Sequence, residues 1–126
     1  MADLKAAAAG GSYDVVIIEG LLTLWAREVY DKLDLRLFVE CRADERIVRR
    51  LRRNMARGLS FDEIADVYLD LVRYRHDAYV EPSKWRADLI LNGSNPSGRA
   101  LEILVVCIRA LSRCSGASGV SEAELV

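Results

Sequence analysis

An arginine-rich stretch, residues 44–58, carries the side chains of this sequence that are best suited to binding an anion. Its arginines recur at intervals of four, three and four residues, which places them along one stripe of an α-helix: Arg46, Arg50, Arg53 and Arg57. Apolar residues fall on the other side of this helix: Ile47, Val48, Leu51 and Met55. Guanidinium groups are planar, permanently charged donors that match phosphate oxygens. We therefore expect a helix that docks through its apolar stripe and presents its arginines to a phosphate-bearing ligand.

The local charge balance supports an anionic ligand. Residues 42–57 contain seven arginines against Asp44 and Glu45, a local charge of +5, whereas the whole chain carries −1. The rest of the chain therefore carries a net charge of −6, so the positive charge is concentrated in residues 42–57. The alternative is a solvated helix face, which is the ordinary role of many charged helices.

Glu19 is the second residue whose position indicates chemistry. It follows residues 13–18 (YDVVII), a β-branched run typical of a strand buried on both faces of a parallel sheet. Ligands bind at the carboxyl edge of such sheets. Because Mg²⁺ takes one or two carboxylates together with substrate phosphates, we expect Glu19 to hold Mg²⁺, through water. A salt bridge or a helix N-terminal charge is the alternative.

The elements that must position these residues alternate between strands and helices. The sequence predicts strands at residues 13–18, 35–39 and 87–91, and helices at residues 2–9, 21–32, 44–58, 60–80 and 98–113. Gly58 is expected to cap the arginine helix, and Ser60 with Glu63 forms a capping box for the next helix, which Pro82 is expected to end. From residue 13 the order is β-α-β-α-α-β-α, which predicts a three-layer α/β/α fold with a small parallel sheet.

One domain is expected over residues 1–114, followed by a flexible tail at residues 115–126. Three strands make a small sheet with open edges, so the chain resembles part of a larger sheet. The sequence has no apolar run near the roughly 20 residues that span a bilayer, and its start lacks the pattern of a signal peptide. We therefore expect a cytoplasmic protein with no membrane partner. His76, the single histidine, is expected at the surface or near a helix end rather than in catalysis.

Three segments together resemble the C-terminal half of the uridine kinase family, which is close to phosphoribulokinase among the P-loop kinases. They are DVVIIEGLLTLW (14–25), LDLRLFVECRADERIVRRLRRNMARG (33–58) and EPSKWRADLIL (81–91). The resemblance implies a partial P-loop-kinase fold and transfer of the γ-phosphoryl group of ATP or GTP, with Mg²⁺, to the 5′-hydroxyl of uridine or cytidine. It also implies that Glu19 is the acid near Mg²⁺.

The resemblance further implies that the arginine helix is a lid over the nucleotide. Arg50, Arg53 and Arg57 would act in catalysis, and Arg46, Arg53 and Arg57 would bind the cofactor. Members of the family usually read R-G-R at the end of this segment, where this sequence has Arg57-Gly58-Leu59. The last lid contact is therefore expected to be missing.

No part of the sequence matches the phosphate-loop pattern G-x-x-x-x-G-K-[ST], because its lysines follow Leu, Asp and Ser: Lys5, Lys32 and Lys84. In the family this loop, its lysine and the catalytic aspartate belong to the N-terminal half. We therefore expect no kinase activity from this chain by itself.

Two other functions stay open at this point. The arginine helix could belong to a nucleic-acid-binding module, although a sequence pI of about 5.9 and the lack of aromatic residues among the arginines disfavour nucleic acid. The chain could also be a partner-dependent kinase half, which pairs its open sheet edge with another chain or forms a homo-oligomer.

Overall fold

The computed structural model describes residues 13–115. These residues divide into two compact units, residues 13–18 with residues 98–115, and Glu19–Ser97. In order, the elements are α2 (Arg27–Tyr30), β1 (Leu37–Glu40), α3 (Ala43–Met55), α4 (Phe61–Val67), η1 (Tyr68–Val72), α5 (Arg73–Arg75), η2 (His76–Val80), η3 (Glu81–Arg86), β2 (Leu89–Asn92) and α6 (Gly98–Ser115). The helix predicted at residues 2–9 and the tail from residue 116 lie outside the described residues.

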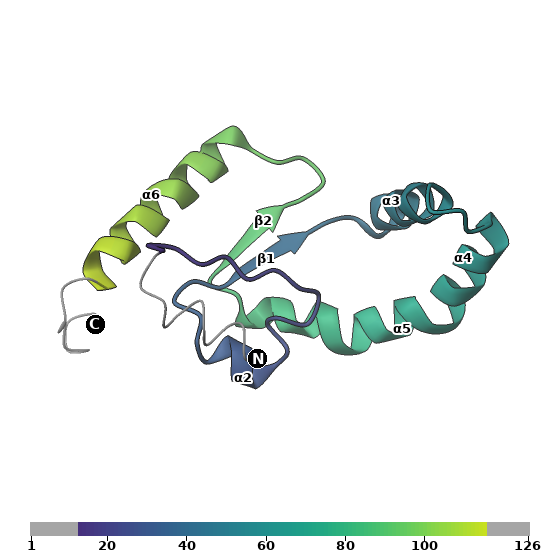
Figure 1. The fold of residues 1–126 in the computed structure, drawn as a ribbon, viewed down its shortest axis with the longest axis horizontal. Coiled ribbons are helices and arrows are strands. Elements are labelled where there is room, and N and C mark those ends of the chain that lie inside the picture. The colour runs from purple at the N-terminus through teal and green to yellow at the C-terminus, as the bar shows by residue number, and fades with distance from the viewer. Residues whose placement is uncertain (1–12, 116–126) are drawn as a thin grey trace. The chain divides into compact units, whose positions relative to one another are not determined.

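The sheet of the second unit is parallel and two-stranded within the described chain (Figure 1). β1 pairs with β2 in a register that runs from Leu37 opposite Leu89 to Glu40 opposite Asn92. At the amino ends of the strands, the backbone N–H of Arg36 donates to the carboxylate of Asp88 at 2.7 Å. The predicted α/β class with a small parallel sheet is confirmed, and both strands bring their carboxyl ends to one edge.

The strand predicted at residues 13–18 is wrong. These residues form no ladder, and the side chains of Tyr13 and Ile17 are 72% and 83% exposed. β-branched residues favour extended backbone, but a strand also needs a neighbour that accepts and donates its hydrogen bonds. Residues 13–18 favour extended backbone, but they have no neighbouring strand to pair with in the described chain.

The helix predicted at residues 21–32 is reduced to a turn followed by α2. The Arg86 guanidinium donates to the backbone carbonyls of Leu24 and Trp25 at 3.3 and 3.1 Å. A continuous helix would use these carbonyls for its own ladder, so the side chain of a residue 61 positions later competes with the local propensity.

The arginine helix, α3, ends as its sequence predicts. Gly58 has a φ of +92°, and the N–H groups of Gly58 and Leu59 donate to the carbonyls of Met55 and Asn54 at 3.0 and 3.2 Å. These bonds form a Schellman motif, in which glycine supplies the left-handed residue. Arg57 therefore lies in the closing turn, beyond the last residue of α3.

A long helical segment follows, and its start matches the predicted capping box. Ser60 Oγ accepts from the N–H of Glu63 at 3.3 Å, and the Glu63 carboxylate accepts from the N–H of Ser60 at 2.8 Å. The segment passes through the π-helical stretches η1 and η2 and continues into the 3₁₀-helix η3. The α- and π-helical run ends at Val80, where the sequence predicts its end, and Pro82 occupies the first turn of η3, where its missing N–H is not required.

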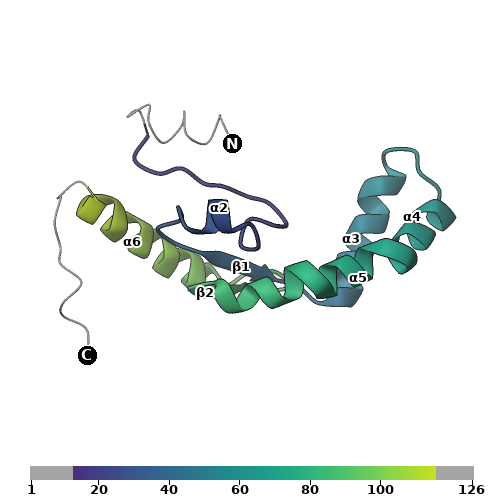
Figure 2. The ribbon, with the colours of Figure 1, turned by 90° about the horizontal axis from the view of Figure 1, so that it is seen from below.

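The core is small. Among residues 13–113, the buried apolar side chains are Leu24, Ile64 and Val80. Figure 2 shows α3 beside the helical segment that begins with α4, so these two helices and the sheet edge form the framework of the second unit. Helix α6 of the other unit agrees with its prediction. Within the described chain, no helix combines the length and apolar character needed to span a membrane.

Candidate functional site

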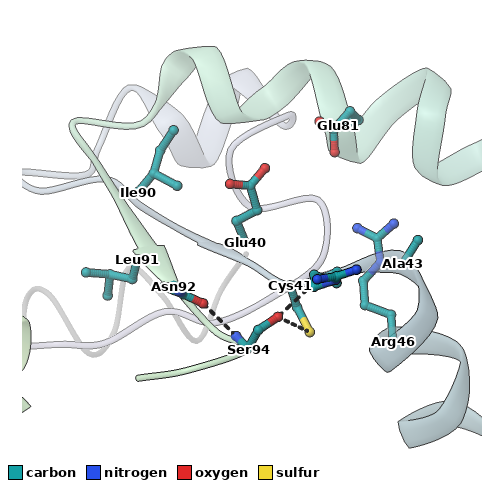
Figure 3. Close-up of a pocket in the computed structure, with 10 residues that line it drawn as sticks. Glu40, Cys41, Ala43, Arg46, Glu81, Ile90, Leu91, Asn92 and Ser94 are labelled. Carbon is teal, nitrogen blue, oxygen red and sulfur yellow. Dashed lines mark hydrogen bonds between the residues drawn. The ribbon is translucent and has the colours of Figure 1, made fainter. Parts of the chain in front are cut away.

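A cavity of about 530 Å³ opens at the carboxyl ends of β1 and β2 (Figure 3). Its walls come from four places: the end of β1, the start of α3, the first turn of η3, and the end of β2 with the loop after it. The polar and charged lining residues are Glu40, Arg42, Arg46, Glu81, Asn92 and Ser94. The cavity lies at the edge of the sheet where ligands of parallel α/β proteins bind.

Hydrogen bonds between the two strand ends hold the floor of this cavity. The Asn92 side-chain oxygen accepts from the N–H groups of Ser94 and Asn95, each at 3.0 Å. Ser94 Oγ in turn accepts from the N–H of Arg42 at 3.1 Å. The loop after β2 is therefore tied to the turn that leads into α3, which fixes where this helix starts.

Gly93 allows the loop to lie close to β1. Its N–H donates to the carbonyl of Glu40 at 2.6 Å, and a Cβ at this position would be 2.7 Å from Val39 Cγ1 and 3.0 Å from the Glu40 carbonyl oxygen. The carbonyl of Gly93 accepts from Arg49 at 3.2 Å. A larger residue would push apart the two ends that form the cavity floor.

Lys84 joins two carboxylates at the rim. Its ammonium group hydrogen-bonds to Glu81 and lies 3.5 Å from the carboxylate of Glu40. The bond to Glu81 raises the pKa of Lys84 above its ordinary value. In Figure 3, Glu40 from β1 and Glu81 from η3 face the same space. Lys84 balances one of these two negative charges, so the cavity carries acidic and basic groups together.

The E-P-S-K segment supplies this arrangement. Ser83 is buried, and its hydroxyl donates to the carbonyl of Val80 at 2.7 Å, which fixes the turn between η2 and η3. The family resemblance rests partly on this segment, but the sequence analysis assigned no function to Glu40, Glu81 or Lys84. The signal that could have found Glu40 is its place at the end of a predicted strand, the same argument that singled out Glu19.

The arginine stripe is divided by its surroundings. Arg46 and Arg50 are half-buried, and Arg46 Nη1 lies 2.7 Å from His76 Nε2 in η2. Arg50 Nε is buried without a hydrogen-bond partner in the described chain. Arg53 and Arg57 are exposed and form no ion pair among residues 13–115. The stripe therefore has a docked half, Arg46 and Arg50, and a solvated half, Arg53 and Arg57.

The predicted apolar stripe of α3 is partly wrong. Ile47 and Leu51 are half-buried, but the side chains of Val48 and Met55 are 45% and 51% exposed. The helix packs on the flank that contains Ile47, Leu51 and the first two arginines of the stripe. The long aliphatic stems of arginine can cover apolar surface, so an arginine need not point to solvent.

The structure shows no ion pair between Glu19 and a described arginine. The Glu19 side chain is exposed and forms no hydrogen bond or ion pair with a described residue. The described chain also contains no group of three or more His, Cys, Asp or Glu side chains that could hold a metal ion. A single solvated carboxylate is compatible with Mg²⁺, which keeps several waters and needs few protein ligands.

The sequence predicted His76 at the surface or near a helix end, and the structure places it at a helix end, as the C-cap residue of α5. Its side chain is only 15% exposed, with Nε2 facing Arg46 and Nδ1 lying 3.3 Å from the carboxylate of Asp77. Sequence reasoning missed this contact, because residues 30 positions apart meet only through the packing of two helices.

The comparisons with known proteins agree on one family. The model of the Phosphoribulokinase / Uridine kinase family matches residues 5–96. Over 99 residues, 78% of this chain, the sequence is 38% identical to the uridine kinase of Clostridium tetani (strain Massachusetts / E88) and covers 47% of that protein. Over the same share of this chain, the uridine kinases of Bacillus subtilis (strain 168) and Staphylococcus aureus (strain JH9) are 36% and 37% identical, with 47% and 48% of their lengths covered. The chain thus spans about half the length of the curated relatives it matches.

Proposed function

The chain belongs to the phosphoribulokinase/uridine kinase family, and on that basis we propose that it supplies the arginine lid of an ATP-dependent nucleoside kinase. The observation that carries the proposal is the solvated half of the stripe. Arg53 and Arg57 are exposed at the end of α3 without an ion-pair partner in the described chain. Two such guanidinium groups can bind a phosphate by releasing only water, without breaking a bond to another described residue.

The proposed reaction transfers the γ-phosphoryl group of ATP or GTP to the 5′-hydroxyl of uridine or cytidine. Phosphoryl transfer depends on positioning and on stabilising the charge that spreads over the transferred group. In the proposal, Arg46, Arg53 and Arg57 bind the triphosphate, and Arg50, Arg53 and Arg57 stabilise the charge that develops on the phosphoryl oxygens.

Glu19 completes the proposed site as a ligand of Mg²⁺, through water. The donor set fits this role, because one solvated carboxylate leaves the ion free to bind water and phosphate oxygens as well. Bound Mg²⁺ would neutralise part of the triphosphate charge. The task of the chain is to keep the carboxylate accessible.

By itself the chain is expected to be inactive. Its sequence contains no G-x-x-x-x-G-K-[ST] loop, and the backbone cradle of such a loop carries much of the triphosphate binding in P-loop enzymes. The proposed activity therefore belongs to an assembly or a longer chain in which a phosphate loop faces the lid.

A chimaera tests the proposal. In the uridine kinase of Clostridium tetani, the 99 residues that match this chain are replaced by their counterparts from it. We expect the chimaera to phosphorylate uridine or cytidine with Mg·ATP, measured as nucleoside-dependent ADP release. A chimaera that folds, by circular dichroism and a cooperative melt, yet phosphorylates neither nucleoside would reject the proposal.

A further inference from the structure

Arg46 and His76 meet between the two helices beside the cavity. Arg46 lines the cavity from α3, and its Nη1 atom lies 2.7 Å from Nε2 of His76, the first residue of η2. The other ring nitrogen, Nδ1, lies 3.3 Å from a carboxylate oxygen of Asp77. The histidine side chain is 15% exposed, whereas that of Asp77 is 77% exposed.

The chemistry of the two groups determines the state of the ring. An arginine has only donors and keeps its proton, so Nε2 of His76 must be the acceptor. An imidazole that accepts at Nε2 is neutral and carries its proton on Nδ1. That proton points to Asp77, whose carboxylate accepts it.

We propose that His76 is a positioning residue that, in its neutral Nδ1-protonated form, holds the guanidinium of Arg46 at the cavity wall. A protonated ring has two donors and no acceptor, so protonation would break the bond to Arg46 and place two cations side by side. That Arg46 contacts a nucleotide rests on the proposed function, whereas its bond to His76 does not.

The charged groups around the His76 ring favour a hydrogen bond between Arg46 and a neutral ring over an ion pair. From α3, Arg46 faces Nε2, and Arg50 follows one turn later, half-buried and with Nε unpartnered in the described chain. From its own helix the ring faces Asp77, which is mostly solvated. The contact is thus a charged donor bound to a neutral acceptor, which is stronger than a neutral pair.

The first test reads the tautomer directly in the full chain without nucleotide. His76 is the single histidine of the sequence, so a long-range ¹H–¹⁵N NMR spectrum assigns both ring nitrogens without ambiguity. At pH 7.5 we expect Nδ1 to be protonated and Nε2 to be unprotonated, and Arg46→Ala to move the population toward the other tautomer. A wild-type ring protonated at Nε2 would overturn the proposal.

The second test compares His76→Gln with His76→Asn. The Gln side-chain oxygen can reach the position of Nε2 and replace the acceptor, whereas the shorter Asn reaches only the position of Nδ1. We expect resolved Nη signals of a restrained Arg46 guanidinium in the wild type and in the Gln variant at pH 7.5. The Asn variant should show averaged signals.

Similar circular dichroism spectra of the two variants would show that both fold alike, so that a difference between their Arg46 signals reports the hydrogen bond and not a folding defect. Equal Arg46 signals in the Gln and Asn variants would reject the positioning role. Both readouts are taken without nucleotide, so they hold or fail independently of the kinase proposal.

Discussion

At the scale of single residues, the surroundings of each arginine decide what it can bind. A guanidinium that already has a protein partner, such as Arg46 with His76 or Arg49 with Glu45, must keep or exchange that bond when a ligand arrives. Arg53 and Arg57 are exposed, so among the described residues they have no bond to break and release only water when a ligand binds. Helical periodicity predicts the four stripe arginines on one side of a helix, but it cannot distinguish these two situations, because the distinction depends on the helix packed against α3.

Gly93→Ala is expected to destabilise the fold. The new Cβ would approach the backbone oxygen of Glu40 to 3.0 Å, where no side-chain rotation can relieve the contact. Overpacking of this kind costs about 1–3 kcal/mol. The measurement is the free energy of urea unfolding in the chimaera. Gly98→Ala is the matched control, because a Cβ there meets nothing within 4 Å. Equal stability of both variants would contradict the close approach of the loop to β1.

At the scale of elements, local signals were predicted well and signals that depend on a neighbour were not. The Schellman turn at Gly58 and the capping box of Ser60 and Glu63 are complete within a few residues, so the sequence contains all their partners. Residues 13–18 have the composition of a strand but form no ladder, and α2 is shortened where Arg86 binds the carbonyls of the preceding turn. Sequence patterns record propensity, whereas pairing is a property of the assembled fold.

The capping box predicts a dependence of stability on acid. The Ser60 hydroxyl, followed by the Ser60 backbone N–H, lowers the pKa of Glu63 below its ordinary value. A lowered folded-state pKa stabilises the protein above the unfolded-state value, and this contribution is lost as the pH falls through the lowered value. Unfolding free energies of the chimaera between pH 7 and pH 3 should therefore converge with those of its Ser60→Ala variant. At pH 7 the chimaera with the intact cap is expected to be the more stable of the two. A difference that is constant across this range would contradict the account.

At the scale of the whole molecule, the second unit exposes apolar side chains on its two strands and on η3. The side chains of Val39 and Ile90 in the two strands are 62% and 48% exposed, and that of Trp85 is 80% exposed. Large exposed apolar patches mark surfaces that bind another element or chain. We expect such a partner to be a further stretch of polypeptide that pairs with the open sheet edge, or a second copy of this chain.

The isolated chain should therefore bind the dye ANS at these exposed side chains and unfold with a shallow dependence on urea concentration, because little apolar surface is buried when it folds. The chimaera is the control and should show neither behaviour. Light scattering on the same samples shows whether self-association covers the surface. A dye-silent monomer with a steep unfolding transition would contradict the expectation of an open sheet.

The most direct test of the arginine lid is Arg53→Ala in the chimaera, read as kcat/KM for nucleoside phosphorylation. Removing one preorganised donor from a charge-stabilising site typically costs about 10²-fold, and we expect a loss of that order. Arg52→Ala is the control, because Arg52 is exposed on the same helix, lies outside the stripe and has no ion pair in the described chain. A large loss for Arg53→Ala with little change for Arg52→Ala is the predicted result, and an unchanged kcat/KM for Arg53→Ala would contradict the account.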